Sequence, residues 1–200
     1  ASDVYKRQVL ASHFHPDHFN KEVLQWREQR PDIIYIFSKD ILRHRRAQKE
    51  DAVWLKKGEE YKDETLSVRA FGSTDVGVSF LLQAGGKKIF HAGDLNNWHW
   101  MDESTEAEWK GAEKNFLHEL DDLYAYTPEV DVAMFPVDPR LGKEYMRGAG
   151  QFVTKIKTHI FVPMHFTPEY AKANAFRDFA EAHGVRFVSL THRGQKIEIE

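Results

Sequence analysis

Three histidines and an aspartate lie close together near the start of this 200-residue chain, in the segment SHFHPDH. A lone histidine is more often structural than a metal ligand. Four such side chains in one short loop would bring their lone pairs together, and imidazole and carboxylate groups are the ligands that zinc and related divalent metals prefer. The loop therefore predicts a metal site that contains His13, His15, Asp17 and His18.

Three later positions place another potential ligand directly after an apolar, strand-like run. Asp75 lies in GSTDVG after LSVRAF, Asp94 follows IFHAG, and His165 follows FVPM. Sites in α/β folds gather where strands end, so we expect these side chains to meet the histidine loop. The chain has no cysteine, so histidine and carboxylates must supply the ligands. The whole set suits two zinc ions that share one carboxylate and a water.

The surrounding sequence alternates short apolar strands with amphipathic helices, which indicates an α/β fold with helices outside mixed sheets. Without repeats or linkers, we expect a single domain over residues 9–200. The pattern predicts strands at 9–11, 33–37, 52–55, 66–71, 77–94 (with a hairpin turn at Gly85–Gly86), 130–137, 159–166, 185–190 and 196–200. It predicts helices from Asn20 to Pro31, at 41–46, from a Thr105–Glu108 capping box to Leu123, from Met146 to Ile156, and from about Phe176 to Gly184.

The first eight residues are interpreted separately. DVYKRQ is what GAT GTG TAT AAG AGA CAG encodes, and that DNA resembles the transposase end sequence used to prepare sequencing libraries. We interpret residues 1–8 as a translated adapter, and we expect the native N-terminal strands to be missing. The alternative is a chance match in a polar segment.

Net charge, cysteine content and hydropathy restrict the class of protein. A formal net charge of -3 gives no general attraction for a phosphate backbone, which disfavours nucleic acid as a partner. The absence of cysteine excludes thiolate zinc sites and disulfides and fits a cytoplasmic protein. No apolar run is long enough to cross a membrane, so we expect no association with a membrane. We expect a small-molecule substrate. The oligomeric state is left open.

The ordered motifs resemble the metallo-β-lactamase superfamily. Its HxHxDH signature stands here at residues 13–18, its GD aspartate is Asp94, and its late histidine is His165. HAGD, VDVAMFPVD and VPMHF are most similar to the branch of broad zinc-dependent hydrolases that includes lactonases. The resemblance runs from about Val9 to the C-terminus. It implies an αβ/βα sandwich of two mixed β-sheets flanked by helices, here without the N-terminal strands.

The resemblance also implies a ligand set. His13 and His15 would bind one zinc ion, Asp94 would bridge, and the second ion would be held by Asp17, His18 and His165. The family usually has a further histidine before the GD aspartate. Here Asp75 stands in its place as a possible ligand, although it could merely cap a turn, and His91 is the competitor.

The activity implied is that of a zinc-dependent hydrolase. A hydroxide bridged by two zinc ions would attack a small ester, lactone or phosphoester, with Asp17 orienting the nucleophile. Mn²⁺ or Fe²⁺ could replace zinc. The alternatives are a phosphodiesterase or nuclease of the same fold, a diiron-type relative that does not hydrolyse, and an inactive fragment. His15 favours zinc over the diiron relatives, which carry a glutamate there.

Two segments could line the substrate pocket. NNWHW follows Asp94 directly and offers Asn96, Asn97, Trp98 and His99, with His99 as a possible general acid. The loop PVDPR offers Arg140, which could bind an anionic group. The alternatives are that the tryptophans only pack the loop, and that Arg140 only contacts Asp138.

Overall fold

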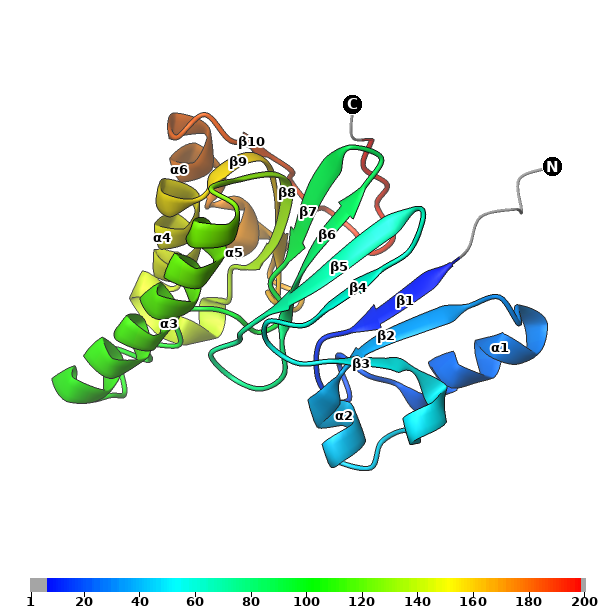
Figure 1. Cartoon of the computed structure of the whole chain (residues 1–200). Coiled ribbons are helices and arrows are strands. Elements are labelled where there is room, and N and C mark those ends of the chain that lie inside the picture. Colours follow the sequence, from blue (N-terminus) through cyan, green and yellow to red (C-terminus); the bar gives the residue numbers. More distant parts are fainter. Residues whose placement is uncertain (1–6, 199–200) are drawn as a thin grey trace.

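The computed structural model describes residues 7–198 and forms two β-sheets that face each other between outer layers of helices (Figure 1). The smaller sheet has the order β1-β2-β3, with all neighbours parallel. Its strands are β1 (Gln8–Ala11), β2 (Ile34–Ser38) and β3 (Val53–Leu55). The α/β class is confirmed. The adapter interpretation falls mostly on residues 1–6, which lie outside the described range.

The larger sheet is mixed and has the order β10-β9-β8-β7-β6-β5-β4. Pairs from β4 to β7 are antiparallel, whereas pairs from β7 to β10 are parallel. The strands are β4 (Glu60–Lys62), β5 (Leu66–Phe71), β6 (Ser79–Ala84), β7 (Lys87–His91), β8 (Glu129–Pro136), β9 (Lys157–Met164) and β10 (Arg186–Phe187).

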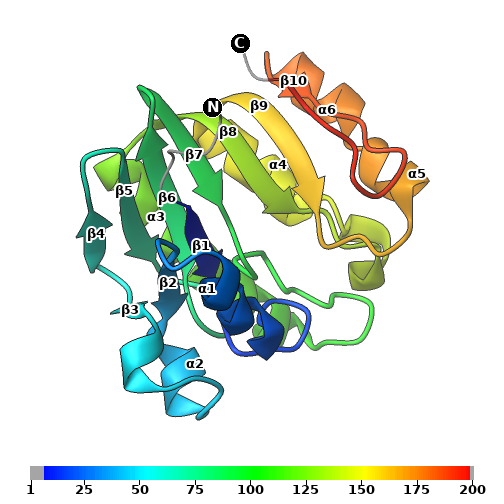
Figure 2. The ribbon, with the colours of Figure 1, turned by 90° about the vertical axis from the view of Figure 1, so that its right-hand side faces the viewer.

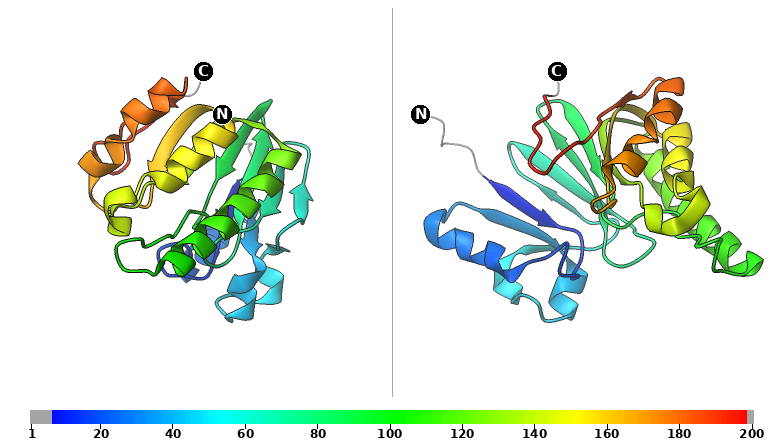
Figure 3. Two further views of the ribbon diagram at one scale, coloured as in Figure 1. Left: turned by 90° about the vertical axis from the view of Figure 1, so that its left-hand side faces the viewer. Right: turned by 180° about the vertical axis from the view of Figure 1, so that it is seen from behind.

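The helices cover the outer face of each sheet, and Figure 3 shows α3 and α4, in green and yellow, lying across the outside of the larger sheet. The α-helices are α1 (Trp26–Gln29), α2 (Lys39–Arg43), α3 (Glu106–Tyr126), α4 (Arg147–Lys155), α5 (Tyr170–Asn174) and α6 (Arg177–Ala182). Three short 3₁₀ helices among the described residues are η1 (Lys21–Gln25), η2 (Lys49–Asp51) and η3 (Pro139–Glu144).

Alternation along the strands supplies the hydrophobic cores on both sides of each sheet. In β2, Tyr35 and Phe37 pack toward η1 and α2, while Ile36 packs with Val68 and Phe80 of the opposite sheet. The outer core of the larger sheet joins its strands to α3, α4 and α6. The sheets are therefore held together by a shared apolar layer that also fixes where their loops meet.

The loops that carry the potential ligands meet at one edge. β5, β7, β8 and β9 run in the same direction, because β6 is antiparallel to both β5 and β7. Their carboxyl ends therefore lie at the same edge of the larger sheet. Figure 2 shows the loops after β1, β7 and β9 gathered at the lower end of the two sheets.

Several elements differ from the prediction. The strand predicted at 185–190 is shortened to β10, and β4 and α5 were not predicted. The segment from Asn20 to Pro31 is a 3₁₀ helix followed by one α-helical turn, although Asn20 does cap it by accepting from Glu22 N–H. The predicted strand at 196–200 is wrong for residues 196–198, which form no strand, and residues 199–200 lie outside the described range. No helix in the described range has the length and apolarity to span a bilayer.

Candidate metal centre

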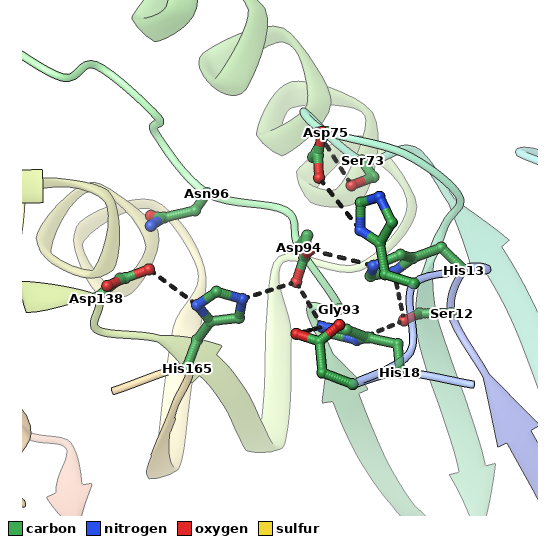
Figure 4. A network of polar contacts seen from close by, with 12 residues as sticks. Ser12, His13, His18, Ser73, Asp75, Gly93, Asp94, Asn96, Asp138 and His165 are labelled. Atoms are coloured by element: carbon green, nitrogen blue, oxygen red, sulfur yellow. Dashed lines mark hydrogen bonds and ion pairs between the residues drawn. The ribbon is translucent and has the colours of Figure 1, made fainter. Parts of the chain in front are cut away.

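Ser12 organises the histidine loop that follows β1. Its hydroxyl oxygen lies 3.1 Å from His13 Nδ1 and 3.2 Å from His18 Nδ1. A hydroxyl oxygen has two lone pairs and can accept from both Nδ1–H groups. In that tautomer both Nε2 atoms keep a free lone pair, and both point at Asp94 (Figure 4). The loop is fixed further by Asp40, which accepts from Phe14 N–H at 3.0 Å.

Asp94 lies between three histidines and is almost fully buried. Its Oδ2 is 3.3 Å from His13 Nε2, and its Oδ1 is 3.2 Å from His18 Nε2 and 3.4 Å from His165 Nε2. Asp94 Oδ1 and His13 Nε2 nevertheless have no hydrogen-bond partner of proper geometry. Ligand atoms that lie close together without hydrogen-bonding to one another are typical of a metal site. The two oxygens of Asp94 face different histidines.

His165 follows β9 and completes the site from the far side. It has a φ of 61°, which is uncommon for a residue with a Cβ. Its Nδ1 lies 2.9 Å from Oδ2 of Asp138, and its ring makes an edge contact with Trp98, with the ring centroids 5.4 Å apart. The side chain is thus held from two directions, with Nε2 directed at Asp94 (Figure 4).

The potential ligands form two groups whose donor atoms all lie within 4.8 Å of one another in each group. One group is His13, His15 and Asp94, and the other is Asp17, His18 and His165. The groups contain six of the seven ligands predicted from the sequence, and their donor types fit zinc. Asp94 falls in the first group, so its bridging role stays a prediction.

Asp75 is brought to the site but lies at its margin. Its Oδ2 is 4.0 Å from His15 Nδ1, and its side chain is 46% exposed. It belongs to neither three-residue group, so its role as a ligand stays a prediction. His91, the competitor, lies outside both groups; its Nδ1 accepts from Gly93 N–H at 3.1 Å.

Charge and burial shift the pKa of the central groups in opposite directions. Burial alone would raise the pKa of the Asp94 carboxyl, but His13, His165 and His18 outweigh it and hold that pKa far below its usual range. The carboxylates of Asp138 and Asp94 raise the pKa of His165 to about 9 despite its burial. The pKa of Asp138 is lowered to about 2, because His165 and Arg140 outweigh its desolvation. In the metal-free protein the site is thus a set of charge-paired groups.

The segment after Asp94 is buried more deeply than a pocket lining would be. Asn96 and Asn97 have no exposed surface, and Asn97 Nδ2 donates to Gln151 of α4 at 2.9 Å. His99 is also buried: Nδ1 accepts from Met101 N–H and Nε2–H donates to the Glu144 carbonyl, both at 3.1 Å. Because both ring nitrogens are engaged, this geometry favours a structural role for His99 over that of a general acid.

Two hollows adjoin the site and share His165 as a wall. The smaller, about 170 Å³, is lined by Asp17, Arg140 and Glu169 among others. The larger, about 610 Å³, is mostly apolar and lies between β8, β9 and the C-terminal segment, with Met134, Val162 and Leu190 in its lining. Arg140 lies at the first hollow and is paired with Asp138, so its role in binding an anionic group stays a prediction.

Two residues of the site were missed from the sequence. Asp138, in PVDPR, was considered only as a partner of Arg140, and Ser12 was not assigned a role although it heads the histidine loop. Both hold a histidine through Nδ1. The sequence signal for Ser12 is its place beside His13, whereas the only signal for Asp138 is its place just after a predicted strand.

Comparison with known proteins identifies the family and the fold. Residues 6–166 match the family model described as the beta-lactamase superfamily domain. The metallo-β-lactamase fold protein YhfI from Bacillus subtilis aligns with a TM-score of 0.55 and 11% identity, covering 84% of this chain and 71% of that one. PqqB from Methylobacterium extorquens, solved with Zn²⁺ bound, aligns with a TM-score of 0.53 and 15% identity, covering 91% and 70%. No curated protein matches significantly.

The family match spans most of the chain and includes every predicted ligand, and the solved structures share the fold. The chain therefore belongs to the metallo-β-lactamase superfamily. Its fold is the layered α/β arrangement that the motifs predicted.

Proposed function

We propose that this protein is a metal-dependent hydrolase that holds a pair of zinc ions and cleaves a small ester, lactone or phosphoester. The observation that carries the proposal is the pair of adjacent ligand groups with Asp94 between them. His13, His15 and Asp94 would hold one ion, with Asp75 as a further ligand. Asp17, His18 and His165 would hold the other, with the second oxygen of Asp94.

Bound zinc supplies a nucleophilic water at neutral pH and positive charge for the developing oxyanion. The protein's own residues then set direction and access. Asp17 is 3.6 Å from His18 Nε2 with its side chain 70% exposed, so it can orient a water or accept its proton from the open side. Substrate would approach from the hollow that Asp17 and His165 line.

The hollows favour a substrate with one apolar part. Met134, Val162 and Leu190 would contact an alkyl or aromatic group, while the reacting carbonyl or phosphoryl centre lies near His165. Because His165 lines both spaces, a single molecule could occupy both. This is the support for proposing small esters and lactones.

The test combines metal analysis with hydrolysis. Elemental analysis of the zinc-loaded protein is expected to give about two zinc ions per chain, with a lower value for Asp75→Ala. Asp178→Ala, an exposed aspartate on α6, is the matched control and should keep the wild-type value. The loaded protein should then hydrolyse p-nitrophenyl esters or simple lactones.

Two outcomes would contradict the proposal. Wild-type protein that binds no zinc, or that binds it without hydrolysing any ester, lactone or phosphoester, is not the proposed enzyme. Cleavage of RNA or DNA in preference to small substrates would favour a nuclease of the same fold. An unchanged zinc content in Asp75→Ala would remove only Asp75 from the ligand set.

A further inference from the structure

We propose that Asp138 is a positioning residue that sets the tautomer and orientation of His165 and so determines how tightly the second metal is held, with Arg140 serving to fix Asp138. The inference rests on the proposed metal site and concerns residues that no ligand motif contains. It also assigns Arg140 a different role, that of holding Asp138, whereas the sequence suggested that Arg140 binds an anionic substrate.

The contact between Asp138 and His165 determines which imidazole nitrogen is free. Asp138 Oδ2 lies 2.9 Å from His165 Nδ1 and can only accept, so this hydrogen bond requires the proton on Nδ1. Arg140 Nη2, which can only donate, is farther from the same nitrogen, at 3.3 Å. Nε2 is then the atom that can bind a metal once its own proton is released, and it lies 3.4 Å from Asp94 Oδ1. His165 belongs to the second ligand group. Carboxylates that bind the remote nitrogen of a metal-ligating histidine orient the ring and raise its basicity.

Arg140 holds the Asp138 carboxylate in place. Its Nε donates to both carboxylate oxygens at 3.0 Å, and its Nη2 donates to Oδ2 at 2.6 Å. Its backbone N–H also donates to Oδ1 at 3.0 Å. Asp138 is only 1% exposed, and a buried carboxylate needs such pairing. The Nε and Nη2 groups of Arg140 therefore donate to Asp138 rather than to a substrate.

Trp98 supports the same ring from another side. Its indole N–H donates to the Asp94 carbonyl at 2.8 Å, and its ring lies edge-on to His165 with the planes at 64°. The left-handed φ of His165 is a conformation that only surrounding contacts maintain. Asp138 and Trp98 are two of the contacts to this ring, and Asp138 is the one that binds Nδ1 at hydrogen-bond distance.

The experiment is competition for zinc against a chromogenic chelator in wild type, Asp138→Asn and Asp138→Ala. Asn can still accept from Nδ1–H but lacks the charge, whereas Ala removes the acceptor. We expect the weaker zinc to lose about 10-fold in affinity in Asp138→Asn and up to about 100-fold in Asp138→Ala, with the tighter zinc nearly unchanged. Esterase activity is a second readout and should fall as the second ion is lost.

Asp131→Asn is the matched control, because Asp131 lies on β8, the strand that precedes Asp138, and accepts from Lys88 N–H away from the ligands. It should bind both ions as wild type does. Thermal unfolding of the metal-free proteins shows whether each variant folds. If Asp138→Ala does not fold, Asp138→Asn alone still tests whether Asp138 determines the affinity for the second zinc ion.

Either of two results overturns the inference: both ions bind both Asp138 variants with wild-type affinity, or the two ions weaken equally. Failure of the proposed function looks different, because wild-type protein itself would then take up no pair of zinc ions; that result would also remove the basis for the role of Asp138. Arg140→Gln should weaken the second zinc as well. A selective rise in KM for anionic esters, with zinc affinity unchanged, would instead return Arg140 to substrate binding.

Discussion

At the scale of single residues, Asp94 is the side chain that lies close to histidines of both ligand groups. Its Oδ2 faces His13, and its Oδ1 faces His18 and His165. His15, by contrast, belongs to the first group alone. Loss of Asp94 should therefore affect both metals, whereas loss of His15 should affect one.

The prediction compares Asp94→Asn with His15→Ala. Asp94→Asn keeps the shape of the buried side chain but replaces one ligand oxygen and the charge, so we expect both zinc ions to weaken and hydrolysis to fall by about 100-fold or more. His15→Ala should lose one zinc ion and retain the other. Zinc titration followed by elemental analysis after gel filtration measures both. Loss of a single ion in Asp94→Asn would mean that Asp94 does not bridge.

The sequence predicted these ligands because their chemistry is contained in residue type and order. It could not predict Asp138 as a partner of His165, because that contact joins residues 27 positions apart on neighbouring strand ends. It also suggested His99 as a general acid, with packing of the loop as the alternative for the tryptophans beside it. The role of His99 depends on the Met101 and Glu144 backbone groups that fold around the ring, and residue type does not reveal them.

At the scale of elements, the loop that carries Asp75 is pressed against the histidine loop. Val78 N–H donates to the Ser12 carbonyl at 3.0 Å. Gly77 lies beside that bond with a φ of 76°, and a Cβ there would lie 2.1 Å from Ser12 O. Gly86 of the β6–β7 hairpin has nearly the same φ, 77°, with nothing within 4 Å of its Cβ position. The two glycines therefore separate backbone strain from steric contact.

Gly86→Ala should cost about 1 kcal/mol, because an L-residue resists the left-handed region, and it should leave zinc binding unchanged. Gly77→Ala should cost a further 1–3 kcal/mol or so, because the added methyl displaces Ser12 and the histidines that it orients. Urea unfolding and zinc titration of both variants check this. Equal stability and equal zinc affinity would show that the two loops are not tightly packed in solution.

Local sequence rules predicted the elements where one rule dominates. The helix α3 begins at Thr105 with the expected capping box, and its buried face includes Phe116, Leu120 and Leu123. The hairpin turn at Gly85–Gly86 joins β6 to β7 as expected. The strand expected at 196–200 fails over residues 196–198, because alternation does not guarantee a neighbouring strand. There Ile197 packs instead onto an apolar group with Val162.

At the scale of the whole molecule, the site joins the two sheets. The histidine loop follows β1 of the smaller sheet, whereas Asp94 and His165 follow β7 and β9 of the larger one. The layered fold was predicted from the ordered motifs of the family, since strand order and sheet pairing leave little trace in local pattern. Each metal would contact ligands from both sheets. Metal binding is therefore expected to raise the free energy of unfolding of the whole chain.

Zinc should therefore stabilise the folded chain as a whole. Any ligand that binds only the native state adds free energy by mass action, about 2.7 kcal/mol at a concentration 100 times Kd. For a chain of this size that raises the melting temperature by roughly 5–10 °C. Differential scanning calorimetry with and without zinc measures the shift, and a chelator should reverse it. Asp94→Asn should lose most of the shift, because the remaining ligands no longer include one that contacts both ions. A shift as large as wild type in Asp94→Asn would mean that zinc stabilises the chain elsewhere.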